Sequence, residues 1–284
     1  MYEVDLDKYK IEKNEVKTKK VNGYKILYTE SKNANMKHVL FVHGIGASLL
    51  AWRDIPDALS EYFHTISVDL IGFGGSDKPE PADYTIKGFS KFILDFLQAI
   101  DIINEKICIV GHSLGGYIAL QFAIENESLV EKLVLVDPSG KLSGPTPLLS
   151  SYFDATNESF TPLKYDKLKR VFEDMYASSS YLLPIVVGIF LDTIERPGAL
   201  YAFNSAFKDS TGNEIGSDEL KKIDIPCLIL WGEYDKLIPG RQYAMKFLKN
   251  LPNSKLEVIP DSGHAPFVEK TSLVYERIHR FLTK

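Results

Sequence analysis

The stretch Ile107-Cys108-Ile109-Val110-Gly111-His112-Ser113-Leu114-Gly115 decides how the rest of the chain is interpreted. Its four leading apolar residues predict a short buried strand, and the run from Ser113 to Glu125 predicts a helix directly after it. Between the two stands Gly-x-Ser-x-Gly, the pattern of a sharp strand-to-helix turn that exposes a serine hydroxyl. Glycine is required at both outer positions because a side chain there would clash within so tight a turn. Ser113 is therefore the predicted nucleophile.

Strand and helix patterns alternate on both sides of this turn. Buried strands are predicted at 38–42, 65–68, 107–110, 133–136, 228–231 and 256–259. Helices are predicted from about residue 50 and at 85–100, 113–125, 242–251 and 272–282. Asn22-Gly23, between two strand-like runs, predicts a hairpin ahead of them. The alternation predicts an α/β fold with a mostly parallel sheet covered by helices on both faces.

The alternation stops between about residues 141 and 222. This segment opens with the breaker cluster Ser143-Gly144-Pro145-Thr146-Pro147 and contains no convincing buried strand. We expect a helical cap inserted after the sixth strand, forming a lid over the carboxyl ends of the strands. The predicted organisation is a core of residues 1–140, a cap of 141–222 and a second core part of 223–284.

A serine nucleophile needs a base to accept its proton and an acid to orient that base. Asp235 follows the predicted strand at 228–231, and His264 follows the last predicted strand. Both positions lie at the carboxyl edge of the sheet, where Ser113 is presented. Asp137, at the end of the strand at 133–136, is the alternative acid.

Two further motifs lie at the same edge, His43-Gly44-Ile45-Gly46 and the run from Asp69 to Asp77. Together with the serine turn they resemble the α/β-hydrolase superfamily, in its capped, serine-nucleophile esterase branch. The resemblance implies a catalytic triad of Ser113, Asp235 and His264. It also implies that the backbone N–H groups of Ile45 and Leu114 form an oxyanion hole, and that no cofactor is needed.

The expected function is hydrolysis of carboxylic esters with an apolar acyl or alcohol part, through an acyl-enzyme intermediate. A hydrolase of carbon–carbon bonds in ring-cleavage products (dienoates) is the first alternative, although such enzymes commonly carry Trp after the histidine, where this chain has Ala265. A small-ligand receptor that retains the triad is the second. Haloalkane dehalogenases and epoxide hydrolases of this fold are excluded, because they use an aspartate where Ser113 stands.

Composition and motif spacing argue against several other classes of function. The 284 residues include 33 basic and 38 acidic ones, and the net charge of −5 argues against nucleic-acid binding. Gly44-Ile45-Gly46 fails as a dinucleotide fingerprint because its third glycine would fall at Leu49. The sequence contains neither a His-Glu-x-x-His motif nor a paired cysteine spacing, so no motif predicts a metal site. Cys108 and Cys227 lie inside apolar runs, which predicts buried free thiols.

The expected partner is a small-molecule substrate, and the expected state is a monomer or homodimer. The acidic segment 1–5 lacks the layout of a signal peptide. The longest apolar stretch, Leu182 to Leu191, is about half the ~20 residues that span a bilayer. We therefore expect a cytoplasmic protein without stable membrane insertion.

Overall fold

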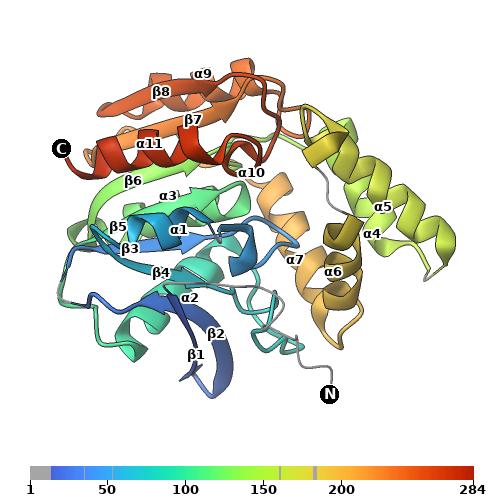
Figure 1. Cartoon of the computed structure of the whole chain (residues 1–284), viewed down its shortest axis with the longest axis horizontal. Helices are drawn as coiled ribbons and strands as arrows, with labels where there is room; N and C mark the ends of the chain where they lie inside the picture. The colour runs from blue at the N-terminus through green and yellow to red at the C-terminus, as the bar shows by residue number, and fades with distance from the viewer. Residues whose placement is uncertain (1–13, 35, 53, 160, 182–183) are drawn as a thin grey trace.

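The computed structural model describes residues 14–34, 36–52, 54–159, 161–181 and 184–284. In this part of the chain, eight strands form one sheet in the order β1-β2-β4-β3-β5-β6-β7-β8. β2 runs antiparallel to β1 and β4, and all other neighbouring pairs are parallel. The predicted α/β fold is confirmed (Figure 1). The strands are β1 (Asn14–Val21), β2 (Tyr24–Ser31), β3 (His38–Val42), β4 (His64–Val68), β5 (Ile107–His112), β6 (Val130–Val136), β7 (Cys227–Gly232) and β8 (Ser254–Ile259).

The predicted hairpin joins β1 and β2. Asn22 and Gly23 have φ values of 51° and 89°, the left-handed conformation that a tight two-residue hairpin turn requires. Val21 pairs with Tyr24 across this turn, so the hairpin prediction is confirmed.

Period-2 alternation gives each central strand two buried faces. In β3, Leu40 and Val42 belong to one apolar cluster, whereas Val39 and Phe41 belong to another on the opposite face. α2 (Ile86–Ala99), α3 (Leu114–Glu125) and α9 (Gly240–Asn250) contribute to the first cluster. α1 (Asp54–Leu59) and α11 (Thr271–Leu282) contribute to the second. Burial on both faces explains why these strands are almost uniformly apolar.

Helices fill the described part of the chain between β6 and β7, where the sequence predicted a cap. They are α4 (Pro147–Asn157), α5 (Pro162–Met175), α6 (Pro184–Ile194), α7 (Ala199–Gly212) and α8 (Ser217–Leu220). α4 to α7 lie together beside one edge of the core in Figure 1. The boundaries 141 and 222, and movement of this unit as a lid, stay predictions. Leu182 and Leu183, part of the predicted apolar stretch, lie outside the described residues.

An aromatic cluster holds the cap helices together. Tyr152 on α4 is its centre, with ring centroids 5.8 Å from Phe172, 5.7 Å from Phe190 and 5.3 Å from Phe203. The three partners come from α5, α6 and α7. Such contacts add to apolar burial, so one side chain joins all four helices.

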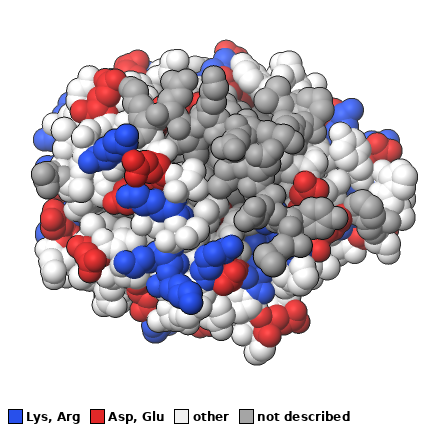
Figure 2. All heavy atoms as spheres, turned by 60° about the horizontal axis from the view of Figure 1, so that its bottom comes forward, with Lys and Arg blue, Asp and Glu red and all other residues white. Residues whose placement is uncertain are grey.

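Further predictions from the sequence concern the two cysteine thiols, membrane insertion and the charge of the surface. Cys108 and Cys227 are buried and free, as predicted. Within the described residues, no helix is both long and apolar enough to cross a bilayer. Figure 2 shows positive and negative side chains interspersed on one face. The absence of nucleic-acid partners, the cytoplasmic location and the oligomeric state stay predictions.

The serine turn yields a stability prediction. A Cβ at Gly115 would meet the backbone carbonyl oxygens of Val42 and His43, and backbone atoms cannot rotate away. We expect Gly115→Ala to lower the free energy of unfolding by about 2–3 kcal/mol, measured by urea denaturation. Gly188→Ala on α6 is the matched control, because an added Cβ meets nothing within 4 Å there. Equal stabilities for the two variants would contradict the prediction.

Candidate active site

Ser113 lies in the turn between β5 and α3 with φ 52° and ψ −116°. Such a conformation costs a non-glycine residue about 1–3 kcal/mol, so surrounding contacts must hold it. The Ser113 N–H donates to the Val136 carbonyl at 3.0 Å, and the Ser113 carbonyl accepts from the Ser139 N–H at 3.0 Å. A Cβ at Gly111 would meet the backbone of Gly115. The glycines therefore permit the close approach of strand and helix that lifts the serine out of the sheet.

His264 and Asp235 form a buried pair at the same sheet edge. Their Nδ1 and Oδ2 atoms are 2.8 Å apart. The other carboxylate oxygen of Asp235 accepts the N–H groups of Leu237 at 2.8 Å and Ile238 at 3.0 Å. With Nδ1 bonded to a carboxylate, the neutral ring carries its proton there, which leaves Nε2 as a proton acceptor.

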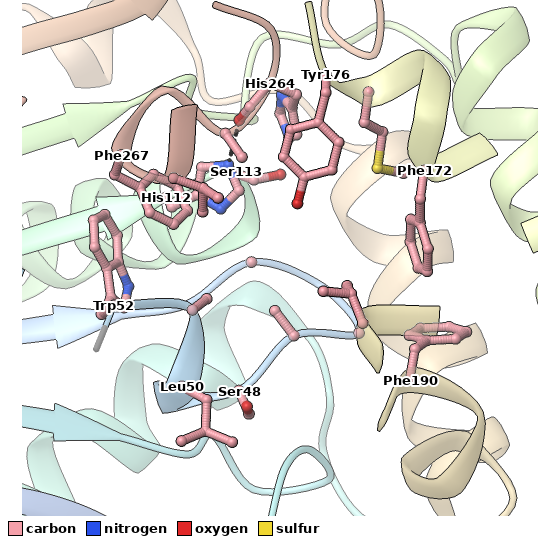
Figure 3. Close-up of a pocket in the computed structure, with 18 of the residues that line it drawn as sticks. Ser48, Leu50, Trp52, His112, Ser113, Phe172, Tyr176, Phe190, His264 and Phe267 are labelled. Carbon is pink, nitrogen blue, oxygen red and sulfur yellow. Dashed lines mark hydrogen bonds between the residues drawn. The ribbon is translucent and has the colours of Figure 1, made fainter. Parts of the chain in front are cut away.

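The structure brings Ser113 and His264 to one cavity (Figure 3). His264 Nε2 is buried and has no hydrogen-bond partner among the described residues. Nucleophile–base hydrogen bonds are often long in free enzymes and shorten when substrate binds. Ser113 and His264 therefore share one cavity, and Asp235 is bonded to His264. The roles of the three side chains as nucleophile, base and acid stay predictions.

Asp137, the alternative acid, lies beside this pair. It is fully buried, and Oδ1 accepts the Gly232 N–H at 2.8 Å. Its Oδ2 has no hydrogen-bond partner among the described residues. Burial, followed by the negative charge of Asp235, raises the pKa of the Asp137 carboxyl well above its usual value. The contact with the histidine ring belongs to Asp235, which favours Asp235 as the acid.

A metal ion has one conceivable set of ligands in the described part of the chain. Side-chain atoms of Asp137, Asp235 and His264 lie within 4.8 Å of one another. The Asp235–His264 hydrogen bond already occupies the ring nitrogen that faces the carboxylates. The group therefore fits a hydrogen-bonded acid–base pair better than a metal centre, and the absence of a metal or cofactor stays a prediction.

The loop that carries Ile45 passes close to Ser113. A Cβ at Gly44 would lie 2.9 Å from His112 Nδ1 and 3.2 Å from Ser113 Cβ. Leu114 is the first residue of α3, so its N–H belongs to the positive end of a helix. Ile45 lines the cavity with Ser113. These positions are compatible with an oxyanion hole, and the role of the two N–H groups stays a prediction.

Two further histidines fix the loops around the site. His43 Nδ1 bonds the Gly44 carbonyl at 2.8 Å, and its Nε2 accepts the Leu70 N–H at 3.1 Å. Burial lowers the pKa of His43 to about 4. His112 Nε2 bonds the His264 carbonyl at 2.8 Å, and burial also lowers the pKa of His112 well below its ordinary value. Both rings are therefore neutral supports near neutral pH.

The cavity has a volume of about 540 Å³ and a largely apolar lining. Its walls come from the Ile45 loop, from α4 to α6 and from the segment after His264. None of the described residues that line it is Lys or Arg. The aromatic members include Trp52, Tyr152, Phe172, Tyr176, Phe190 and Phe267.

Sequence reasoning assigned no role to Tyr152, Tyr176 or Phe267. Phe267 lies three residues after His264, and this proximity was the available signal. The two tyrosines come from α4 and from the end of α5, far from the motifs in sequence. Only the packing of the cap on the core places them at the cavity.

Comparisons with known proteins agree with this architecture. The model of the alpha/beta hydrolase family matches residues 39–277. Lipase 3 of Moraxella sp. is 30% identical over 87% of this chain and 78% of its own length. The 2-hydroxy-6-oxo-6-(2'-aminophenyl)hexa-2,4-dienoic acid hydrolase of Metapseudomonas resinovorans is 26% identical over 81% and 79%.

A solved structure also matches. The meta-cleavage product hydrolase of Pseudomonas fluorescens superimposes with a TM-score of 0.83 at 22% identity, covering 94% of this chain and 97% of the other. The fold, the serine turn and the family model converge, and the chain belongs to the alpha/beta hydrolase family.

Proposed function

We propose that the protein hydrolyses carboxylic esters with an apolar acyl or alcohol part, with Ser113 as nucleophile. The observation that carries this proposal is the placement of Ser113 on a positive-φ turn, at an apolar cavity shared with a carboxylate-bound histidine. A hydroxyl, a base and an acid in this order can transfer an acyl group without a cofactor.

In the proposed mechanism, His264 Nε2 accepts the Ser113 proton as the hydroxyl oxygen attacks the ester carbonyl. Asp235 keeps the imidazole oriented and stabilises the charged ring. The N–H groups of Ile45 and Leu114 donate to the oxyanion, where one such donor contributes about 3–4 kcal/mol to transition-state stabilisation. The alcohol leaves with the proton that His264 returns, and water then hydrolyses the acyl-enzyme by the same route.

The lining of the cavity supports an uncharged, apolar substrate. Its described residues include no lysine or arginine that could pair with a substrate anion. The similarity to Lipase 3 points in the same direction.

Carbon–carbon bond hydrolysis is the second candidate, because one relative acts on a dienoic acid. That substrate class carries a carboxylate, which an enzyme commonly binds with a cation. A receptor function is the third candidate, distinguished by a ligand that raises thermal stability without turnover.

The first prediction concerns acyl specificity. Wild-type protein should hydrolyse p-nitrophenyl esters with a maximum at one acyl chain length, because cap side chains form part of the cavity wall and limit its length. Ser113→Ala should reduce kcat by about 10⁶-fold. Folded wild-type protein without activity on any chain length would contradict the esterase proposal and direct testing to dienoates and to ligand binding.

The second prediction distinguishes the two acids. Asp235→Asn should lower kcat about 10⁴-fold, because the amide no longer stabilises the productive tautomer. Asp137→Asn should retain kcat within about tenfold, since Asp137 makes no hydrogen bond to the ring. Steady-state ester kinetics measure both values. The reverse order of effects would assign the acid role to Asp137.

The third prediction tests the cap wall of the cavity. Phe190→Leu should shift the preferred acyl chain to a longer one, because it removes aromatic volume from the lining. Each added methylene that becomes buried should raise kcat/KM about fourfold, from ~0.8 kcal/mol per CH₂. Phe153→Leu is the matched control: Phe153 packs on Phe203 and Phe207 in the same cap but does not line the cavity. An identical chain-length profile for both variants would contradict this assignment.

A further inference from the structure

Glu269 joins two segments that are distant in the sequence. It ends the short helix α10 (Pro266–Glu269), and its side chain is buried. Its Oε1 accepts the Gly263 N–H at 2.6 Å, and its Oε2 accepts the Ala177 N–H at 2.8 Å. Gly263 precedes the predicted base, and Ala177 follows cap helix α5. Both oxygens of one buried carboxylate are therefore used to connect the cap with the catalytic loop.

Direct backbone contacts reinforce this connection. The His264 N–H donates to the Met175 carbonyl at 2.7 Å. A Cβ at Gly263 would meet that same carbonyl oxygen and would lie 2.9 Å from the Ala177 nitrogen. Glycine at 263 therefore allows segment 175–177 to lie against the loop that presents His264.

Tyr176 lies between the two bonded positions of this segment. Its ring enters the cavity from the cap beside His264 and Ser113 (Figure 3). Burial raises the pKa of Tyr176 to about 12, so the hydroxyl is a neutral donor at physiological pH. Its hydroxyl belongs to the polar groups that line the cavity.

We propose that Glu269 is a positioning residue that joins cap segment 175–177 to the His264 loop and thereby fixes both His264 and Tyr176 at the cavity. In this arrangement the cap is attached to the active site at the C-terminal end of α5, and the Tyr176 hydroxyl is a hydrogen-bond donor to the substrate. The kinetic consequences of this assignment rest on the esterase function proposed above, whereas its structural consequences do not.

Hydrogen–deuterium exchange tests the connection without any substrate. In Glu269→Ala, peptides covering 175–177 and 262–264 should both exchange about tenfold faster than in wild type, because two amides lose their side-chain acceptor. Glu269→Gln keeps one acceptor oxygen, so a smaller increase is expected, and this variant decides the question if the alanine variant fails to fold. Unchanged exchange in either segment would overturn the proposal.

Two control variants separate the connection from general effects. Glu276→Gln removes an exposed carboxyl from α11, where it contacts Arg277 and Arg280, and should leave exchange in both segments unchanged. Tyr176→Phe retains every backbone contact and should also leave it unchanged. Faster exchange in these two controls, equal to that of Glu269→Ala, would overturn the assignment to the carboxylate.

Ester kinetics then separate the two positioned side chains. Glu269→Ala should lower kcat about 100-fold, the cost typical of a slightly displaced catalytic group, and Glu269→Gln should recover part of the loss. Tyr176→Phe should mainly raise KM, about tenfold, through the loss of one substrate hydrogen bond. If the KM of Tyr176→Phe equals that of the wild type, the proposed hydrogen bond between Tyr176 and the substrate is refuted. Wild-type protein inactive on all esters would refute the esterase function, while the exchange experiment would still decide the role of Glu269.

Discussion

Close approach of backbone to backbone at the Gly111–Gly115 turn is the constraint on which the rest of the site depends. α3 starts so near the end of β5 that neither outer position accepts a side chain. Ser113 is held at φ 52° because its N–H donates to β6 and its carbonyl accepts from the loop after β6. The sheet supplies the rigidity that this conformation needs, because β5 lies between β3 and β6 and is buried on both faces. The same turn directs the N-terminus of a helix, with its partial positive charge, toward the position where an oxyanion would form.

Electrostatics around the histidine distinguish Asp235, the expected acid, from its alternative Asp137. Asp235 has three hydrogen-bond partners for its two oxygens: the His264 ring and two backbone N–H groups. Asp137 is buried with one backbone donor, so two nearby negative charges would be costly and its protonated form is favoured. One group can then act as a charged partner of the imidazole, while the other contributes packing and a neutral carboxyl.

The cap contributes apolar side chains to the cavity, and its contacts hold two loops of the site in place. Tyr152 connects four cap helices through ring contacts, while its hydroxyl lies 3.4 Å from the carbonyl of Ile45 in the proposed oxyanion loop. On the other side of the cavity, Glu269 and the Met175 carbonyl attach the cap to the histidine loop. The cap therefore contacts both the proposed oxyanion loop and the loop that carries His264. A protein built this way would select substrates by the shape of the cap and orient its reacting groups through the same contacts.

Local sequence patterns predict the confirmed fold and select Ser113, His264 and two candidate acids, Asp235 and Asp137, whose catalytic roles stay predictions. Short apolar runs and helical periodicity identify the strands and helices, and the glycine spacing identifies the turn, because these features depend on neighbours in the chain. Which aspartate contacts His264 depends on how β6, β7 and β8 are aligned, and no local pattern records a distance of 2.8 Å between residues 29 positions apart. The positions of Tyr152, Tyr176 and Glu269 at the site cannot be predicted from local patterns for the same reason. Their positions follow from the packing of the cap on the core, an outcome of side-chain shape and long-range hydrogen bonding that only the tertiary structure decides.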